Sequence, residues 1–394
     1  MRPTLLYASP LPPEQSGIAD YSAALLPALA ERYDITLMAK HGSSLPAALR
    51  ERFPIQPDAR GEFDRTLLHL GNSPPHHDTI LAEFRRRPAP VLLHDVVLFF
   101  LIAGLEGERP DFLAQVAAHS GPRAIAALRP WLRSGGDVRA FPQPERVPLN
   151  EEIIDRAPLL LVHSEFALRA IRAHRPSALV VRLPMIDMTA DQTPDRDAAA
   201  ALLHQRLSID PGAFVVASFG FIIPTKQNQV VAEAVLELDR PGGRPVIYVM
   251  AGVGASADSL IGPRVRKTGW LPPDLYAALL ARADLVANLR YPSMGESSIA
   301  LVSAMAAGRA CLVSDLGSYA ELPADVVCRL PARPLEARAA VRAAIERAMT
   351  DPAWTRELGE RARRHVRQYH APGVVARELS AALESFAGFQ PTTA

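Results

Sequence analysis

Residues 284–308 read DLVANLRYPSMGESSIALVSAMAAG, and this stretch contains the unit from which the fold is built. Asp284 to Leu289 is a short apolar run of the kind found in buried strands. Ile299 to Ala307 has the composition of a helix that packs on a sheet, and Gly308 is suited to end that helix. A buried strand followed closely by a buried helix is one half of a parallel βαβ unit. The polar residues 295–298 therefore lie in the turn between strand and helix.

This polar turn, GESS, has two interpretations. Free backbone N–H groups and the helix dipole at the start of a helix favour an anion such as phosphate. Serine is also a preferred N-cap residue, so Ser297 and Ser298 can simply begin the helix. The turn by itself does not distinguish a phosphate-binding site from a helix cap.

Short apolar runs alternate with helical stretches along the whole chain, as expected for parallel sheets. These runs are Thr4–Ala8, Ile35–Met38, Thr66–Leu70, Val91–Leu93, Leu159–Val162 and Leu179–Leu183, then Phe214–Phe219, Val246–Met250, Asp284–Leu289 and Ala310–Val313. A polar, acidic stretch from Met185 to about Ala200 separates the two series and is typical of a connection between domains.

We therefore predict an α/β fold with two facing Rossmann-like, doubly wound domains and a cleft between them. The predicted parts are an N-terminal acceptor-binding domain, a linker, a C-terminal nucleotide-sugar-binding domain, and a C-terminal helix and tail for which packing back on the N-terminal domain is one option. Their ranges are 1–186, 187–200, 201–368 and 369–394. Because such sheets bind ligands outside the carboxyl ends of their strands, the cleft is the expected nucleotide site.

One segment, residues 111–148, interrupts the alternation of the first domain and carries Trp131 and several prolines. It can shape an acceptor pocket or cover the sheet. We favour covering, which is what most inserted segments do.

Composition excludes several classes of protein. The 394 residues are 48% hydrophobic and 22% charged, which is typical of a globular chain with two cores. The 43 basic and 42 acidic residues leave a net charge of +1, which argues against a nucleic-acid binder. Cys311 and Cys328 offer neither a metal cluster nor a disulfide framework. The longest apolar run, 96–105, is too short for a bilayer. With no signal-peptide pattern either, we expect a cytoplasmic protein.

Two segments of the first domain place candidate residues after strands. The loop SPLPPEQSGIADYS, residues 9–22, holds Gly17, which lets backbone amides approach a phosphate or sugar closely; an ordinary βα loop is the alternative. His94 and Asp95 follow the strand Val91–Leu93. His94 can hydrogen-bond a sugar hydroxyl or relay a proton, and a structural histidine is the alternative.

Two segments of the second domain place cations after strands. Lys226 ends the run SFGFIIPTK and is one of only three lysines in the chain, and it can offer a compact positive charge to a diphosphate. Arg290 precedes the opening turn and can supply a second charge. The segment AGVGASA, residues 251–257, fits a dinucleotide-binding pattern but follows the second strand of its domain, so we interpret it as a sharp turn.

Taken in order, these segments resemble the retaining GT-B glycosyltransferases of the family-four type, the bacterial glycosyl transferases group 1, over nearly the whole chain. PLPPEQSGIADYS resembles the family's glycine loop, LLHLGNSPPHHDTI and VLLHDVVL resemble acceptor-domain segments, and FGFIIPTK resembles the phosphate-binding strand and lysine. The most specific resemblance is TGWLPPDLYAALLARADLVANLRYPSMGESSIALVSAMAAGRACLVSDLGSYAELP, which is similar to the donor-binding core.

This chain departs from the family's pattern at three positions. Aligned on SAMAAG, the family's paired glutamates fall at Gly295 and Ser303, and Glu296 is shifted by one residue. Phe221 stands where many members carry an arginine ahead of the lysine. Whether Glu296 replaces the paired glutamates stays open.

The resemblance implies a hexosyltransferase of bacterial polysaccharide biosynthesis. It would move a sugar from a nucleoside-diphosphate sugar to a hydroxyl acceptor, which is a glycan, a lipid-linked molecule or a small molecule, with retention of anomeric configuration. The expected catalytic residues are His94, Lys226 and Glu296. The expected donor-binding residues are Gly17, Arg290, Gly295, Ser297 and Ser298, and the expected acceptor-side residues are Asp20 and Asp95.

We expect no metal or other cofactor, because the cations can stabilise the diphosphate and the sequence shows no metal-ligand cluster. Two alternatives remain. A nucleotide-sugar epimerase could share the fold. A non-catalytic nucleotide-sugar-binding partner of another transferase is suggested by Gly295 and Ser303 in place of glutamates.

The basic run RARRHVRQYH, residues 361–370, could lie on an anionic membrane, but a solvated helix face is favoured. The donor base, the sugar, the acceptor, the linkage and the oligomeric state are not determined by the sequence.

Overall fold

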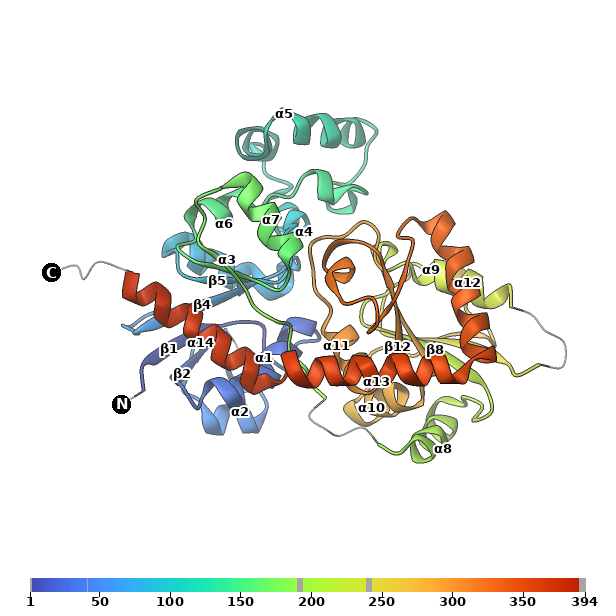
Figure 1. Ribbon diagram of the computed structural model, residues 1–394. Coiled ribbons are helices and arrows are strands. Elements are labelled where there is room, and N and C mark those ends of the chain that lie inside the picture. The colour runs from blue at the N-terminus through green and yellow to red at the C-terminus, as the bar shows by residue number, and fades with distance from the viewer. Residues whose placement is uncertain (1, 41, 190–193, 239–242, 390–394) are drawn as a thin grey trace. The chain divides into compact units, whose positions relative to one another are not determined.

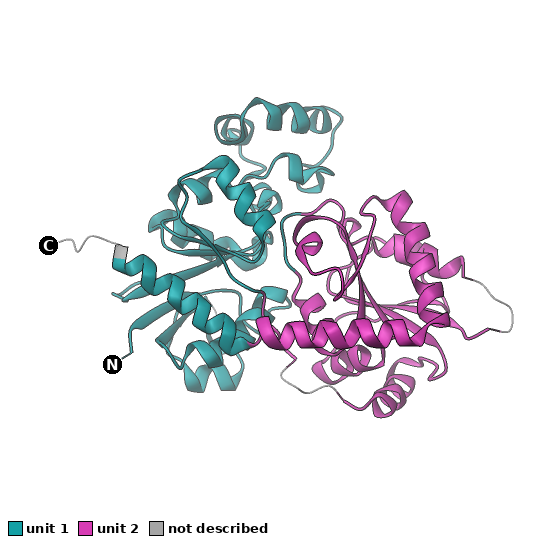
Figure 2. Ribbon diagram, in the orientation of Figure 1, with its two compact units in different colours: residues 1–184, 294–297, 372–394 teal, residues 185–293, 298–371 magenta. Residues whose placement is uncertain are grey.

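The computed structural model describes residues 2–40, 42–189, 194–238 and 243–389 (Figure 1). The chain divides into two compact units (Figure 2). Unit 1 comprises residues 1–184, 294–297 and 372–394, and unit 2 comprises residues 185–293 and 298–371. Part of the predicted linker, 190–193, lies outside the described residues, and helix α8 (Arg196–Leu207) begins within the remainder.

Unit 1 is built on a seven-stranded sheet in the order β3-β2-β1-β4-β5-β6-β7, with all neighbours parallel. The strands are β1 (Thr4–Ala8), β2 (Asp34–Met38), β3 (Ile55–Gln56), β4 (Arg65–Leu70), β5 (Val91–Leu93), β6 (Leu160–Val162) and β7 (Val180–Arg182). The order reverses between β1 and β4, and ligands bind at such a switch point in open parallel sheets.

Unit 1 has eight helices in the described ranges, most of which lie between consecutive strands of the sheet. They are α1 (Gly17–Leu29), α2 (Ala47–Arg52), α3 (Pro74–Arg86), α4 (Phe99–Glu106), α5 (Phe112–Arg133), α6 (Glu151–Arg156), α7 (Glu165–His174) and α14 (Pro372–Phe389), with short turns η1 (Gly42–Ser44), η2 (Val138–Ala140) and η3 (Pro144–Arg146). Helices α1 and α7 begin at serine N-caps, Ser16 and Ser164, as their sequences favour.

The C-terminal helix α14 belongs to unit 1. It packs against α1. Glu384 of α14 accepts hydrogen bonds from Tyr33 Oη at 2.8 Å and from Arg65 Nε at 3.1 Å, and Arg65 also pairs with it through Nη2 at 2.5 Å. These contacts tie the last helix of the chain to residues near its beginning.

The inserted segment 111–148 does not lie directly on the sheet, so our preference for a sheet cover was wrong. Its helix α5 packs against α6 and the short turns η2 and η3, beyond the helical layer of the unit (Figure 1). Gly121 breaks α5 with φ 75° and ψ −174°. Phe112, Val116 and Leu128 of α5 are buried in the core of unit 1, which the insertion therefore extends outward.

Unit 2 repeats this architecture with a six-stranded parallel sheet in the order β10-β9-β8-β11-β12-β13. Its strands are β8 (Phe214–Phe219), β9 (Val246–Ala251), β10 (Val265–Lys267), β11 (Leu285–Asn288), β12 (Ala310–Ser314) and β13 (Cys328–Leu330). Its remaining elements are η4 (Pro224–Lys226), α9 (Asn228–Leu236), η5 (Asp258–Leu260), α10 (Pro273–Arg282), α11 (Ile299–Ala306), η6 (Gly317–Glu321), α12 (Pro334–Thr350) and α13 (Pro352–Tyr369).

Counted within its own unit, each sheet begins with the order 3-2-1-4-5-6, which is the Rossmann arrangement. The predicted α/β fold with two Rossmann-like doubly wound domains is confirmed. No helix in the described ranges is long and apolar enough to cross a membrane.

Candidate functional site

Lys226 is held at the carboxyl end of β8. Its Nζ donates a hydrogen bond to the carbonyl oxygen of Phe219, the last residue of the strand, at 3.2 Å. Gly220 follows with φ 89°, and a Cβ there would lie 2.7 Å from Nζ. Glycine therefore leaves the space in which the lysine folds back over the end of the strand. The half-buried ammonium stands where β8 meets its loop.

The AGVGASA turn after β9 supports the loop that carries Lys226. A Cβ at Gly252 would lie 1.9 Å from the carbonyl oxygen of Gly220, and a Cβ at Gly254 would lie 2.0 Å from that of Ile222. The Ile222 amide donates to the carbonyl of Val253 at 2.6 Å. The two glycines thus allow one loop to pack on the other, backbone to backbone.

Arg290 is a buried cation after β11, the neighbour of β8 across the switch point of unit 2. Its backbone N–H donates to Ser314 Oγ at 2.8 Å, and its Nη1 donates to the carbonyl oxygen of Leu289 at 2.7 Å. Its guanidinium carbon lies 5.7 Å from the ring centre of Tyr319. Since a guanidinium stays protonated in proteins, Arg290 places a fixed positive charge beside the strand that leads to Lys226.

Ser298 is the N-cap of α11. Its Oγ accepts a hydrogen bond from the Leu301 amide at 3.2 Å and donates one to Asn288 Oδ1 at 3.1 Å. The capping interpretation of the GESS turn therefore holds for Ser298. The dipole of α11 and the other N–H groups of its first turn can still interact with an anion.

Gly295 belongs to the short segment 294–297 that groups with unit 1. The Met294 carbonyl accepts hydrogen bonds from the amides of Val96 and Val97 at 2.9 and 3.0 Å. Gly295 has φ 77°, and a Cβ there would lie 2.8 Å from Val96 Cβ. Glycine is required here by backbone conformation and by packing on Val96, a reason that sequence reasoning did not supply.

The other two polar residues of this segment are both half-buried. Glu296 accepts a hydrogen bond from the Met294 amide through Oε2 at 2.7 Å, so part of its carboxylate fixes the local backbone. Ser297 stands next to it, at the point where the segment ends. Glu296 stays a predicted catalytic residue, and Ser297 stays a predicted donor-binding residue.

His94 lies in a cluster with two histidines that the sequence analysis missed, His69 in β4 and His163 directly after β6. His69 Nδ1 and His94 Nε2 are 3.1 Å apart, within hydrogen-bond distance. The His94 ring centre lies 5.2 Å from that of His163 and 5.1 Å from that of Tyr21, which meets it edge-on at 79°. Tyr7 lies against His69 with ring centres 4.6 Å apart. Three adjacent strand ends thus carry three imidazoles.

Two of the three imidazoles, His69 and His94, are uncharged near neutral pH. Burial, with smaller contributions from the neighbouring imidazoles, lowers the pKa of His69 and of His94 well below the ordinary value. Burial likewise lowers the pKa of His77, on α3, to about 3 and raises that of Tyr21 well above its ordinary value. Near neutral pH these groups offer hydrogen bonds and no charge.

Asp95 and Asp20 lie in the same unit. Asp95 Oδ2 accepts a hydrogen bond from the Asn72 amide at 2.9 Å, so this carboxylate supports the loop after β4. Asp20 lies in the first turn of α1, where burial raises its pKa to about 6. Gly17 is the exposed first residue of the same helix, directly after the N-cap Ser16. The α1 N-terminus therefore follows β1 beside the switch point of unit 1.

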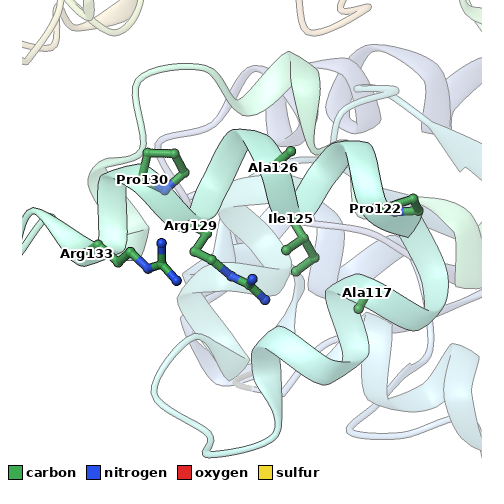
Figure 3. Close-up of a pocket in the computed structure, with 7 residues that line it drawn as sticks. All are labelled: Ala117, Pro122, Ile125, Ala126, Arg129, Pro130 and Arg133. Carbon is green, nitrogen blue, oxygen red and sulfur yellow. The ribbon is translucent and has the colours of Figure 1, made fainter.

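The insertion carries a hollow of its own on the broken helix α5, with a volume of about 490 Å³. Its walls are small apolar side chains and two arginines, as Figure 3 shows. The lining residues are Ala117, Pro122, Ile125, Ala126, Arg129, Pro130 and Arg133. None of the predicted site residues lines it, and the acceptor-pocket alternative for residues 111–148 stays a prediction.

The basic run 361–370 is partly engaged inside unit 2. Arg361 Nε donates to the Asp325 carbonyl at 2.7 Å, and Arg363 Nε donates to the Ala306 carbonyl at 3.1 Å. His370 Nδ1 lies 2.7 Å from the Met185 carbonyl oxygen, and since a carbonyl oxygen only accepts, the histidine donates this hydrogen bond. These contacts favour a structural helix face.

In the described ranges, no group of three or more His, Cys, Asp or Glu side chains is arranged to hold a metal ion.

Comparison with known proteins agrees with this architecture. Residues 244–381 match the family model described as glycosyl transferase-like. The fold is similar to that of sucrose-phosphate synthase from Thermosynechococcus elongatus, with a TM-score of 0.67 and 14% identity over 99% of this chain and 100% of that one. It is also similar to Anabaena HepE in complex with UDP-glucose, with a TM-score of 0.66 and 16% identity over 98% and 100% of the two chains.

A third similar structure is WaaG, a glycosyltransferase involved in lipopolysaccharide biosynthesis, with a TM-score of 0.62 and 14% identity over 96% of this chain and 99% of that one. A search of curated proteins gives no match. The predicted GT-B fold is confirmed, and residues 244–381 of its C-terminal part match a glycosyl transferase-like family model.

Proposed function

We propose that this chain is a glycosyltransferase that moves a sugar from a nucleoside-diphosphate sugar to a hydroxyl acceptor, with retention of configuration at the anomeric carbon. The observation that carries the proposal is the pair of cations at the switch point of unit 2, where Lys226 follows β8 and Arg290 follows the neighbouring β11. The similar fold of Anabaena HepE, solved in complex with UDP-glucose, supports a nucleotide-sugar donor.

Charge development on the leaving group is the main obstacle in such a reaction. When the bond between sugar and diphosphate breaks, negative charge grows on the diphosphate, and prearranged positive groups stabilise that charge. Lys226, Arg290 and the N-terminus of α11 are the groups that we assign to this task. Because these groups supply the positive charge, we propose that transfer proceeds without a metal ion, and activity in excess EDTA tests this.

The residues of unit 1 are assigned to the sugar and the acceptor. His94 is neutral, so it is suited to hydrogen-bond a sugar oxygen. Asp20, with a pKa raised to about 6, is suited to exchange a proton with a hydroxyl group. Gly17 marks a helix start at which backbone can approach a ligand, and Asp95 and Glu296 complete the proposed polar set.

Two measurements test the proposal. A thermal-shift panel of nucleotides and nucleotide sugars identifies the donor, because a ligand that binds the native state raises the melting temperature. Release of nucleoside diphosphate is then measured with and without candidate acceptors. We expect release that depends on the acceptor and a product whose anomeric configuration, read by NMR, matches the donor. Conversion of the donor to its epimer without an acceptor would instead indicate an epimerase.

A non-catalytic nucleotide-sugar-binding partner is the second candidate, and it is favoured by two positions. Where the resemblance places glutamates, Gly295 packs on Val96, and Ser303 is buried with its Oγ donating to the Ile299 carbonyl at 3.0 Å. Neither position offers a carboxylate to a ribose. Donor binding without turnover across a broad acceptor panel would establish this role.

A further inference from the structure

His69 and His94 are joined across two neighbouring strands. Strands β4 and β5 pair in parallel, with His69 opposite Leu92, and the His94 amide continues the ladder by donating to the Leu70 carbonyl at 2.8 Å. This register brings His69 Nδ1 within 3.1 Å of His94 Nε2. Tyr21 stands edge-on to the His94 ring and limits its rotation. The contact therefore depends on backbone pairing as well as on the two side chains.

The contact leaves His94 one nitrogen for a ligand. A neutral imidazole has one N–H donor and one acceptor nitrogen. Burial keeps both rings neutral, so one of the facing nitrogens donates and the other accepts. Since Nε2 of His94 is taken by His69, only Nδ1 can meet a bound molecule. His69 is fully buried, whereas His94 keeps 7% of its surface exposed.

The far side of His69 indicates the direction of this hydrogen bond. Its Nε2 is buried and has no hydrogen-bond partner within the described part of the chain. If His94 were the donor, neutral His69 would carry its proton on that Nε2, as a buried N–H without an acceptor. Buried N–H groups without partners are rarer than buried acceptors without partners. The favoured arrangement has His69 donating from Nδ1, His94 accepting at Nε2, and the His94 proton on Nδ1.

We propose that His69 is a positioning residue that fixes His94 as the Nδ1–H tautomer, so that His94 presents a hydrogen-bond donor to an oxygen of the bound sugar or phosphate. The nature of the ligand rests on the proposed function, whereas the tautomer does not. Tyr7, Tyr21, His77 and His163 lie around the pair, and the Asp95 carboxylate, which follows His94 in the chain, accepts a hydrogen bond from the Asn72 amide. Burial raises the pKa of both tyrosines and lowers that of His77, so these three bring no charge that would reverse the hydrogen bond.

The tautomer is measured directly by NMR on the wild-type chain labelled with ¹⁵N in its histidines, with the His94 signal assigned by its absence in His94→Asn. We expect the directly bonded proton of His94 on Nδ1 and an unprotonated Nε2 at neutral pH. A proton on Nε2 of His94, or a charged ring, would overturn the proposal. This readout needs no substrate.

Paired variants test the consequence for a ligand. An asparagine amide can place its nitrogen near the Nδ1 position and a glutamine amide near the Nε2 position, so His94→Asn retains the proposed donor and His94→Gln does not. With UDP-glucose as the first donor probe, we expect His94→Asn to keep kcat within about tenfold of wild type and His94→Gln to lose as much as His94→Ala. The reverse order of the two variants would contradict the donor role of Nδ1.

The positioning role is tested at His69 itself. His69→Asn keeps an N–H facing His94, whereas His69→Leu removes it. We expect the Nδ1–H tautomer and most of kcat in the first variant, and a mixed tautomer with lower kcat in the second. An unchanged His94 tautomer in folded His69→Leu would refute positioning. If the wild type transfers no sugar but His94 has the Nδ1–H tautomer, the proposed function fails while the tautomer inference stands.

Discussion

The two sheets share the strand order 3-2-1-4-5-6, yet the carboxyl ends of their strands carry different chemistry. In unit 2 the loops after β8 and β11 carry cations, Lys226 and Arg290. In unit 1 the ends of β4, β5 and β6 carry His69, His94 and His163, of which burial holds the first two neutral. Both units thus offer a row of strand ends, of which unit 2 uses the first and fourth for cations and unit 1 uses the fourth to sixth for imidazoles, and the side chains decide the ligand. Cations suit a diphosphate, and neutral donors and acceptors suit sugar hydroxyls.

The strongest test of this contrast is Lys226→Ala. Removing the ammonium at the end of β8 leaves the developing charge of the diphosphate less stabilised, and we expect kcat to fall by about 10²–10³. Steady-state kinetics measure the effect. The matched control is Lys40→Ala, because Lys40 is another of the three lysines and is an exposed residue of unit 1 whose Nζ lies 4.0 Å from Asp78 Oδ2. A Lys226→Ala enzyme within threefold of the wild type would remove Lys226 from the mechanism.

The next test is a substitution at His94 in unit 1. His94→Ala should lower kcat by about 10², because a hydrogen bond made to the sugar in the transition state is lost. Binding of the bare nucleoside diphosphate, measured by calorimetry, should stay nearly unchanged, since the cations of unit 2 are intact. A lower melting temperature with normal turnover per folded molecule would instead make His94 a structural residue.

Gly295 tests whether the GESS turn is constrained by packing. Gly295→Ala places a Cβ 2.8 Å from Val96 Cβ on a residue with φ 77°. We expect it to reduce the free energy of unfolding by about 1–3 kcal/mol, the usual strain of a non-glycine residue in this conformation. Chemical denaturation measures it against Gly262→Ala, a position with no atom within 4 Å of the added Cβ. Equal free energies of unfolding for the two variants would show that the backbone of the turn adjusts to the added Cβ without strain.

The last test is a pH dependence of stability that arises from His77, a buried histidine of α3. Burial lowers the pKa of His77 to about 3 in the folded chain, so below about pH 6.5 the unfolded chain takes up a proton that the folded chain does not. Stability should therefore fall as the pH drops from about 6.5 towards 3, by at most about 1.4 kcal/mol per pH unit for this group.

Asp20 acts in the opposite sense, because its pKa is raised from 3.8 to about 6 and its contribution to stability is lost as the pH rises through that range. The contribution of Asp20 cancels when the wild type is compared with His77→Asn, because both chains keep Asp20. We expect a shallower loss of stability on acidification in His77→Asn, and no change of slope in His119→Asn, which alters an exposed histidine on α5. Parallel slopes for His77→Asn and wild type would contradict a neutral His77.

The sequence by itself determined the class of fold and the cations of the candidate site. Parallel strands buried on both faces appear as short continuous apolar runs, so the central strands of both sheets could be located from composition. The edge strands β3, β10 and β13 were missed because their two or three residues include polar side chains and form no apolar run, whereas the edge strand β7 lies within the apolar run Leu179–Leu183 and was found. Lys226 and Arg290 could be found because each follows an apolar run that ends at the ligand-binding edge of its sheet.

Only the tertiary structure decided which residues share a site and why certain residues are where they are. His69 and His94 are 25 residues apart in the chain, and they meet because β4 and β5 are hydrogen-bonded neighbours in register. In the sequence LLHL, His69 has the pattern of a core position, and nothing local indicates its partner. Gly295 likewise suggested close approach of a ligand, whereas its backbone conformation and Val96 already require glycine. Local sequence encodes periodicity and strand ends, but contacts between strands depend on the order in which the sheet assembles them.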